Sequence, residues 1–187
     1  MVEWALSHLP PRNENENEPQ QRILEVGSGN GTLLFALSEA GYAPSSLHGI
    51  DYSQGAVQLA RNISVTKGLS GDEGAKGSIR FEECDFLTQD PPFPSSSEEG
   101  KVASWDLILD KGTYDAIALG AKDPSTGRSP AIHYPGRVAR LLKQGAYFLI
   151  TCMSFLLCLV VHVTHIHQHA TLRKKNSQTH SYPKRQT

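Results

Sequence analysis

Apolar and polar positions follow two alternating periods from residue 22 onward. Short apolar runs of strand length predict strands near residues 22–27, 46–51, 78–84, 104–110 and 145–151. Apolar residues at helical spacing predict helices near 31–41, 53–67 and 131–143. Because strands that alternate with helices are typical of βαβ units, the chain is expected to form an α/β fold with a mostly parallel sheet.

The segments that flank this alternating region differ from it in composition. Residues 1–9 predict a short helical turn, and the Asn- and Glu-rich stretch up to Pro19 predicts a solvated linker. Loops rich in Gly, Pro, Ser and Glu are expected at 70–77, 88–101 and 121–130. We divide the chain into an N-terminal segment and linker (1–20), an α/β domain (21–152) and a tail expected to be disordered (153–187).

Length and charge narrow the possible partners. The 187 residues suit one domain with a substantial core. A net charge of −1 and a pI near 6.7 give no electrostatic footprint for nucleic acid, which favours a protein or small-molecule substrate. Cys84, Cys152 and Cys158 show neither disulfide nor metal spacing, and no N-terminal signal is evident. We therefore expect a cytoplasmic protein.

A glycine turn stands where the first predicted strand meets the first predicted helix. Residues 25–31 read Glu-Val-Gly-Ser-Gly-Asn-Gly, and such a strand–turn–helix unit suits nucleotide binding because glycine permits close approach to unpaired N–H groups. Thr32 occupies the place of the third glycine in a dinucleotide fingerprint, which disfavours a dehydrogenase. The G-x-G-x-G spacing after an acidic residue resembles the S-adenosylmethionine loop of class I methyltransferases, and this resemblance implies a Rossmann-like sheet.

Two later strand ends fit the same resemblance. Asp51 ends the second strand 20 positions after Gly31, and a carboxylate there accepts hydrogen bonds from both ribose hydroxyls. The third strand ends in Asp85-Phe86. In the methyltransferase pattern this pair lies beside the adenine, with the acid taking the amino group and the aromatic closing over the ring.

The fourth strand end makes the resemblance more specific. Residues 110–115 read Asp-Lys-Gly-Thr-Tyr-Asp, and residues 49–53 read Gly-Ile-Asp-Tyr-Ser. With the glycine turn, these motifs resemble the lysine methyltransferases of translation elongation factor 1-alpha over about residues 22–152. The resemblance implies S-adenosylmethionine as cofactor, a protein substrate and cytoplasmic activity. It implies Glu25, Gly27, Gly29 and Gly31 for the methionine part, Asp51 and Tyr52 for the ribose, and Asp85 and Phe86 for the adenine.

The acceptor side is expected at Asp110 and Tyr114. A lysine with its usual pKa of ~10.4 is charged at pH 7, so a methylating site must lower that pKa and hold the nitrogen in line. We expect Asp110 to accept a hydrogen bond from the amine and Tyr114 to line the lysine channel. The alternative is that Asp110 and Asp115 only cap the following turn.

The resemblance ends after Thr151, where the final antiparallel strand pair of a class I methyltransferase is expected to be missing. We consider three interpretations of the tail. It could be translated intron, because Cys152-Met153-Ser154 can be encoded with a splice-donor sequence typical of fungi. It could be a membrane anchor, although Met153 to Val163 is too short to span a bilayer. Finally, it could bind metal through the histidines at 162, 165, 167 and 169.

A sheet without its last strands would leave an unpaired edge and favour aggregation. Because missing strands could prevent activity, we keep two alternatives to an active enzyme. The chain could be a non-catalytic S-adenosylmethionine-binding scaffold, or an inactive truncated product.

Overall fold

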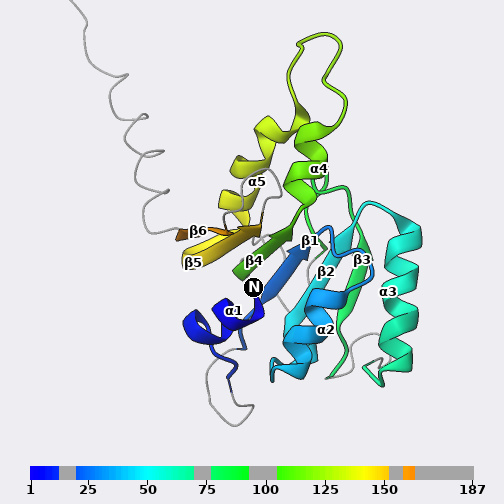
Figure 1. Cartoon of the computed structure of the whole chain (residues 1–187), viewed down its shortest axis with the longest axis vertical. Helices are drawn as coiled ribbons and strands as arrows, with labels where there is room; N and C mark the ends of the chain where they lie inside the picture. The colour runs from blue at the N-terminus through cyan, green and yellow to red at the C-terminus, as the bar shows by residue number, and fades with distance from the viewer. Residues whose placement is uncertain (13–19, 70–76, 93–104, 152–157, 163–187) are drawn as a thin grey trace, which may run out of the picture.

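The computed structural model describes residues 1–12, 20–69, 77–92, 105–151 and 158–162 and contains one mixed sheet (Figure 1). The strands lie in the order β3-β2-β1-β4-β5-β6, and all neighbouring pairs are parallel except β5 and β6. Their bounds are β1 (Ile23–Val26), β2 (Leu47–Asp51), β3 (Arg80–Glu83), β4 (Trp105–Lys111), β5 (Leu142–Thr151) and β6 (Cys158–His162). The predicted α/β class and all five predicted strands are confirmed.

The helices agree with the prediction except around β4 and β5. The α-helices are α1 (Val2–His8), α2 (Thr32–Glu39), α3 (Gln54–Thr66), α4 (Thr113–Leu119) and α5 (Tyr134–Leu141), with 3-10 turns at η1 (Pro44–Ser46) and η2 (Pro130–His133). Helix α4 stands where only a turn was considered. The helix predicted over 131–143 divides into η2, α5 and the start of β5, because Leu142 turns to an extended conformation and pairs with Trp105 of β4.

Strand β6 corrects the prediction of a tail without structure at residues 158–162. It runs antiparallel to β5, with Thr151 opposite Cys158 and Tyr147 opposite His162. An open edge of β5 presents unpaired N–H and C=O groups, and the β-prone sequence of 158–162 can satisfy them. A second strand of the expected pair is not found in the described part of the chain. The tail histidines at 165, 167 and 169 lie outside the described residues, and no described helix is long and apolar enough to cross a bilayer.

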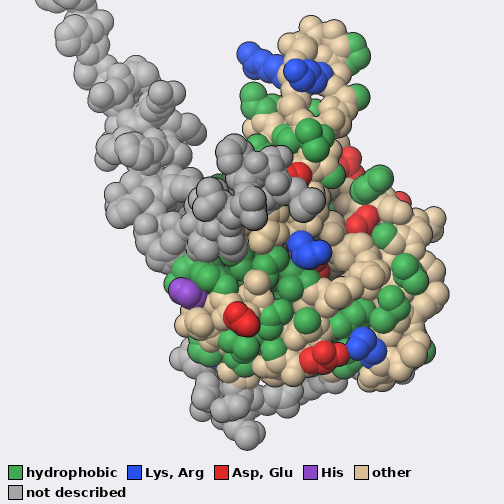
Figure 2. All heavy atoms as spheres, in the orientation of Figure 1, with side chains coloured by type: hydrophobic (Ala, Val, Ile, Leu, Met, Phe, Trp, Pro, Cys, Tyr) green, Lys and Arg blue, Asp and Glu red, His purple; other side chains and the backbone are tan. Residues whose placement is uncertain are grey.

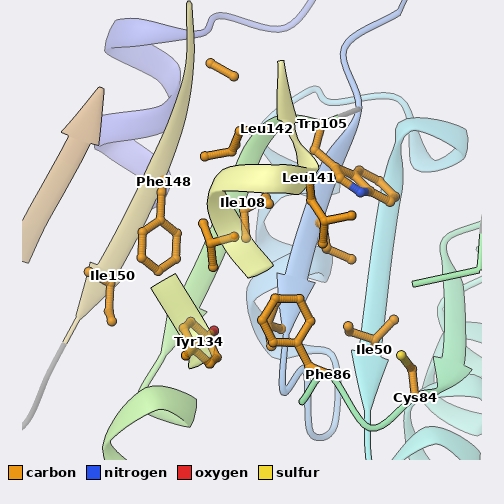
Figure 3. Packing of buried hydrophobic residues seen from close by; sticks show 14 residues of the cluster. Ile50, Cys84, Phe86, Trp105, Ile108, Tyr134, Leu141, Leu142, Phe148 and Ile150 are labelled. Atoms are coloured by element: carbon orange, nitrogen blue, oxygen red, sulfur yellow. The ribbon is translucent and has the colours of Figure 1, made fainter. Parts of the chain in front are cut away.

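Helices cover both faces of the sheet. One face packs Ile23, Leu47 and Leu107 against side chains of α1, α2 and α3. The other packs Leu24, Ile50 and Ile108 against α5 and the segment after β3. Figure 3 shows this second cluster, in which the rings of Phe86, Tyr134 and Phe148 come from three different elements. Alternating strand residues thus serve two cores, as expected for a sheet buried on both sides.

The N-terminal helix packs on the domain. Ala5 is fully buried, and the Trp4 ring meets the Tyr147 ring edge to face, with centroids 5.2 Å apart. The buried Tyr42 hydroxyl donates a hydrogen bond of 2.8 Å to the carbonyl of Leu9. Residues 1–9 therefore belong to the folded unit, whereas most of the predicted linker, residues 13–19, lies outside the described residues.

Candidate functional site

The carboxyl ends of β1, β2 and β4 meet at one edge of the sheet. Val26 is paired in register with Ile50 of β2 on one side and with Asp110 of β4 on the other. The connections leave β1 and β4 in opposite directions along the sheet, and such a switch point forms a ligand crevice in open α/β folds. Figure 1 shows the loop between α4 and η2 projecting beyond this edge.

The glycine turn after β1 is held by the end of β2. The amides of Gly27 and Ser28 both donate to the carbonyl of Ile50, at 2.8 and 2.9 Å. Gly27, Gly29 and Gly31 all have positive φ, at 69°, 54° and 80°. A Cβ at Gly27 would stand 2.0 Å from the Thr113 Oγ1, whereas one at Gly29 would meet no heavy atom within 4 Å. Gly27 is therefore needed for packing, and the backbone of Gly29 is open to a ligand.

Asp51 ties the end of β2 to the same turn. Its Oδ2 accepts a hydrogen bond of 2.9 Å from the Gly29 amide, and its Oδ1 accepts one of 2.9 Å from the Ser53 amide. The side chain is nearly buried, but a carboxylate has about four acceptor positions, so capacity for further donors remains. Tyr52 is 81% exposed.

Asp85 and Phe86 lie at the turn after β3. The Asp85 carboxylate accepts hydrogen bonds from the Leu87 amide (3.0 Å) and the Thr88 hydroxyl (2.8 Å) and is exposed. Phe86 is buried, and its ring lies 4.9 Å from that of Tyr134 (Figure 3). The apolar ring is buried in the core, and the expected contact of this aromatic with a base stays a prediction.

Glu25 is a buried carboxyl group on β1. It is 3% exposed, and its Oε2 has no hydrogen-bond partner among the described residues. Burial raises the pKa of Glu25 to about 8; Lys111 opposes this shift, while the charges of Asp110 and Asp51 add to it. At neutral pH the group is therefore mainly protonated in the absence of a cation.

Asp110 is fully buried at the end of β4. Its Oδ1 accepts the Thr113 amide at 2.7 Å, and its Oδ2 accepts the Tyr114 amide at 2.9 Å and the Tyr134 hydroxyl at 2.5 Å. Burial raises the pKa of Asp110, and the hydrogen bonds from Tyr134, Thr113 and Tyr114 oppose that shift. The carboxylate therefore caps the first turn of α4, a contact that the alternative interpretation of Asp110 expects, while its contact with an acceptor amine stays a prediction.

Residues missed by the sequence analysis connect these positions. Thr113 donates its hydroxyl to the carbonyl of Val26 at 2.8 Å, and Tyr134 contacts Asp110 from α5. Arg137 and Arg140 of α5 both pair with Asp90, in the turn after β3. No local motif marks Tyr134, which is 24 positions from Asp110. Of these four residues, Thr113 alone lies within a motif that the sequence analysis identified, residues 110–115.

The rim of the site includes the loop between α4 and η2. Asp123 organises this loop, because its Oδ1 accepts hydrogen bonds from the Ser125 and Thr126 amides at 2.7 and 3.1 Å. Lys122 and Arg128 are exposed, and Figure 2 shows basic side chains at the tip of the projecting loop. The loop predicted at 121–130 thus projects at the ligand side of the sheet.

Comparison with known proteins bears on this site. Residues 17–186 match a family model described as a methyltransferase domain, a range that continues past residue 152, where the motif resemblance was expected to end. The chain is 35% identical over 161 residues to protein-lysine N-methyltransferase efm4 of Schizosaccharomyces pombe, covering 83% of this chain and 61% of that protein. It is 35% identical over 155 residues to EEF1A lysine methyltransferase 2 of Danio rerio, covering 83% and 54%. The chain thus spans less than two thirds of the length of these relatives.

Solved structures share the fold. The [4+2]-cyclase SpnF superposes with a TM-score of 0.53 at 18% identity, covering 81% of this chain and 43% of that one. A putative S-adenosylmethionine-dependent methyltransferase from Methanococcus maripaludis superposes with a TM-score of 0.50 at 17% identity, covering 81% and 53%. At such identities the likeness concerns the fold.

Proposed function

The chain belongs to the methyltransferase domain family, and from this premise we propose that it transfers a methyl group from S-adenosylmethionine to a lysine of translation elongation factor 1-alpha. S-adenosylmethionine is the cofactor of this family. The relatives' names support a lysine as acceptor and the elongation factor as substrate. We propose the cytoplasm as the site of the reaction, since the proposed substrate is a translation factor.

The residues at the end of β1 and β2 fit the cofactor. The open backbone at Gly29 gives the methionine part room to approach the turn. The unpartnered Oε2 of Glu25 offers an acceptor for a cationic ligand, and a cation there would lower the pKa of this carboxyl group. Asp51 has acceptor capacity for ribose hydroxyls beside its bond to Gly29. Asp85 and the exposed Tyr52 flank the same edge on the adenine and ribose sides.

The residues at the end of β4 fit the acceptor. When bound, S-adenosylmethionine supplies a methyl group on a positively charged sulfur. The incoming lysine amine must be neutral and held in line, and partial burial at the strand ends disfavours its protonated form. Because three donors already occupy the Asp110 carboxylate, we assign Asp110 to positioning α4 rather than to direct contact with the amine. Tyr114, half-buried in the first turn of α4, is the residue we assign to the lysine channel.

One observation carries the proposal: the residues proposed for the cofactor and those proposed for the acceptor are in direct contact at the ends of the adjacent strands β1 and β4. The Thr113 hydroxyl bonds to Val26 and fills the space beside Gly27, so the start of α4 lies directly against the glycine turn. A transfer reaction requires such proximity between the two sites. A scaffold that only bound the cofactor would not need it.

Calorimetric titration with S-adenosylmethionine tests the first half of the proposal. We expect saturable binding that Asp51→Ala weakens by at least tenfold, because the change removes the acceptors for the ribose and the bond to Gly29. Glu39→Ala is the matched control, since Glu39 forms an exposed ion pair with Lys67 at the end of α2 opposite the glycine turn and should leave binding unchanged. Equal affinities for the wild type and Asp51→Ala would contradict the cofactor site.

Transfer of a labelled methyl group to purified elongation factor 1-alpha tests the second half. The expected product is methyl-lysine, absent when cofactor or enzyme is omitted. Binding of the cofactor without transfer to the elongation factor would contradict the proposed activity and favour the scaffold reading. Failure of a soluble, folded chain to bind cofactor would overturn both.

A further inference from the structure

Tyr134, the first residue of α5, lies at the centre of the contacts between three candidate site residues. It is 1% exposed, and its hydroxyl donates to Asp110 Oδ2 at 2.5 Å. Its ring lies 4.9 Å from the Phe86 ring and 5.5 Å, edge to face, from the Tyr114 ring. Tyr134 therefore contacts the Phe86 ring, which the motif assigns to the adenine side, the Asp110 carboxylate, and Tyr114, which we assign to the acceptor channel.

The hydroxyl of Tyr134 completes the hydrogen bonds of Asp110. Without it, the donors that the described residues offer to the carboxylate would be the two amides of Thr113 and Tyr114. A phenol donating to a carboxylate in a buried site forms a strong, charge-assisted hydrogen bond, because water does not compete there. The position of the carboxylate, and with it the first turn of α4, thus depends on a residue of α5.

The contact reaches the glycine turn through Thr113. The Thr113 amide is held by Asp110, while the Thr113 hydroxyl is held by Val26. A chain of contacts therefore runs from Tyr134 through Asp110 and Thr113 to the end of β1. Helix α5 is held independently of this chain of contacts, because Val138 and Leu141 are buried in the core beside the ion pairs of Arg137 and Arg140 with Asp90.

We propose that Tyr134 is a positioning residue of the methyl-transfer site: its hydroxyl fixes the Asp110 carboxylate, which in turn sets the first turn of α4 and Tyr114 against the glycine turn. This inference rests on the proposed function and deepens it. Tyr134 acts through Asp110, and its hydroxyl is already occupied by the carboxylate.

The test compares Tyr134→Phe with Tyr42→Phe. Phenylalanine keeps the ring contacts and deletes one hydroxyl. Tyr42 is a matched control because it is also buried, at 2% exposure, and its hydroxyl donates a single bond of 2.8 Å to the Leu9 carbonyl on the opposite face of the sheet. Each variant loses one buried hydrogen bond, and the bond of Tyr134 is the stronger because its acceptor is a carboxylate, so thermal melts first check that both variants are folded.

The two variants should differ in turnover. We expect Tyr134→Phe to lower kcat about tenfold while the Kd for S-adenosylmethionine changes less than twofold. The acid limb of its pH–rate profile should move to higher pH, because losing a donor raises the pKa of Asp110. Tyr42→Phe should retain the wild-type kcat and profile. Equal kcat values and equal profiles for both variants would overturn the positioning role.

A second measurement separates this inference from the proposed function. Carboxyl ¹³C NMR of the aspartates follows the ionisation of Asp110 without turnover, and Tyr134→Phe should raise the pKa of Asp110 while Tyr42→Phe leaves it unchanged. If the wild-type chain methylates nothing, the proposed function fails, and this titration still decides whether Tyr134 fixes the carboxylate. An unchanged Asp110 titration in Tyr134→Phe would contradict the inference.

Discussion

Two buried carboxyl groups on adjacent strands, Glu25 of β1 and Asp110 of β4, have opposite surroundings. Glu25 has an oxygen without a partner among the described residues, and burial raises its pKa to about 8. Asp110 is more deeply buried, yet three donors surround it. A carboxylate with donors stabilises the backbone that supplies them, whereas an unpaired one costs stability. The Asp110 carboxylate is thus committed to holding α4, whereas Glu25 keeps a free acceptor oxygen among the described residues, which fits the cationic ligand that we propose.

Gly27→Ala should have the largest effect, because Gly27 lies where the two strand ends touch. The added Cβ would stand 2.0 Å from Thr113 Oγ1 at a residue with φ of 69°. Strain and overpacking together should cost about 3–5 kcal/mol and abolish cofactor binding.

Gly68→Ala is the matched control: its φ is 68°, but its Cβ would meet no heavy atom within 4 Å. It should lose only about 1–2 kcal/mol in denaturant unfolding. Equal losses would show that the contact with Thr113 is unimportant.

Asp110→Asn should come next. The amide nitrogen of asparagine cannot accept a hydrogen bond and would face donors that the carboxylate now satisfies. We expect a loss of about 2–4 kcal/mol in stability, with turnover reduced more than cofactor affinity. Denaturant unfolding measures the loss of stability, and single-turnover rates measure the loss of turnover. Full turnover and unchanged stability would mean that Asp110 neither caps α4 nor serves the acceptor side.

Glu25→Gln also replaces a carboxyl group by an amide of the same shape, but it should raise the stability of the folded protein. An unfolded glutamate loses its proton above about pH 4.5, while folded Glu25 keeps it up to about pH 8. The wild type therefore becomes less stable as pH rises across this window. Glutamine does not titrate, so the variant should be more stable at pH 7, by up to about 3 kcal/mol.

The advantage of Glu25→Gln should vanish near pH 4.5, which serves as its internal control. The variant should also bind S-adenosylmethionine more weakly and lose the rise in wild-type affinity expected between pH 6 and 8. Thermal melts and titrations at several pH values measure both. A destabilised Gln variant at pH 7 would show that Glu25 has a partner in the folded state.

Asp90→Ala should have the smallest effect. The Asp90 side chain is 52% exposed and pairs with Arg140, which is 46% exposed, and with Arg137, which is 16% exposed. Because water reaches the Asp90 carboxylate in both pairs, we expect a loss of about 1 kcal/mol that shrinks in high salt. Comparing melts at low and high salt checks this. A larger loss would mean that the anchoring of α5, and not the Tyr134 hydroxyl alone, holds the β4 end in place.

The conformation around the glycine turn was more predictable than the conformation around Asp110. The sequence predicted the glycine turn and the position of Asp51 because a glycine-rich turn and a strand-end carboxylate are local features. Both make hydrogen bonds within a few residues of themselves. Helix α4 was missed because its cap is the carboxylate that the motif assigned to the acceptor. The burial of the Phe86 ring could not be predicted, because a motif specifies the residue type and not the direction of its side chain.

The sequence by itself determined the alternation of strands and helices, the glycine turn and the order of the strand-end carboxylates. Apolar periodicity and positive φ at glycine are local properties that each segment carries alone. The tertiary structure decided which carboxyl group is paired, that Tyr134 reaches Asp110 across 24 positions, and that residues 158–162 add a strand to β5. Burial and hydrogen bonding between distant segments decide these outcomes, because the same carboxyl group is stabilising or costly according to the donors that folding places beside it.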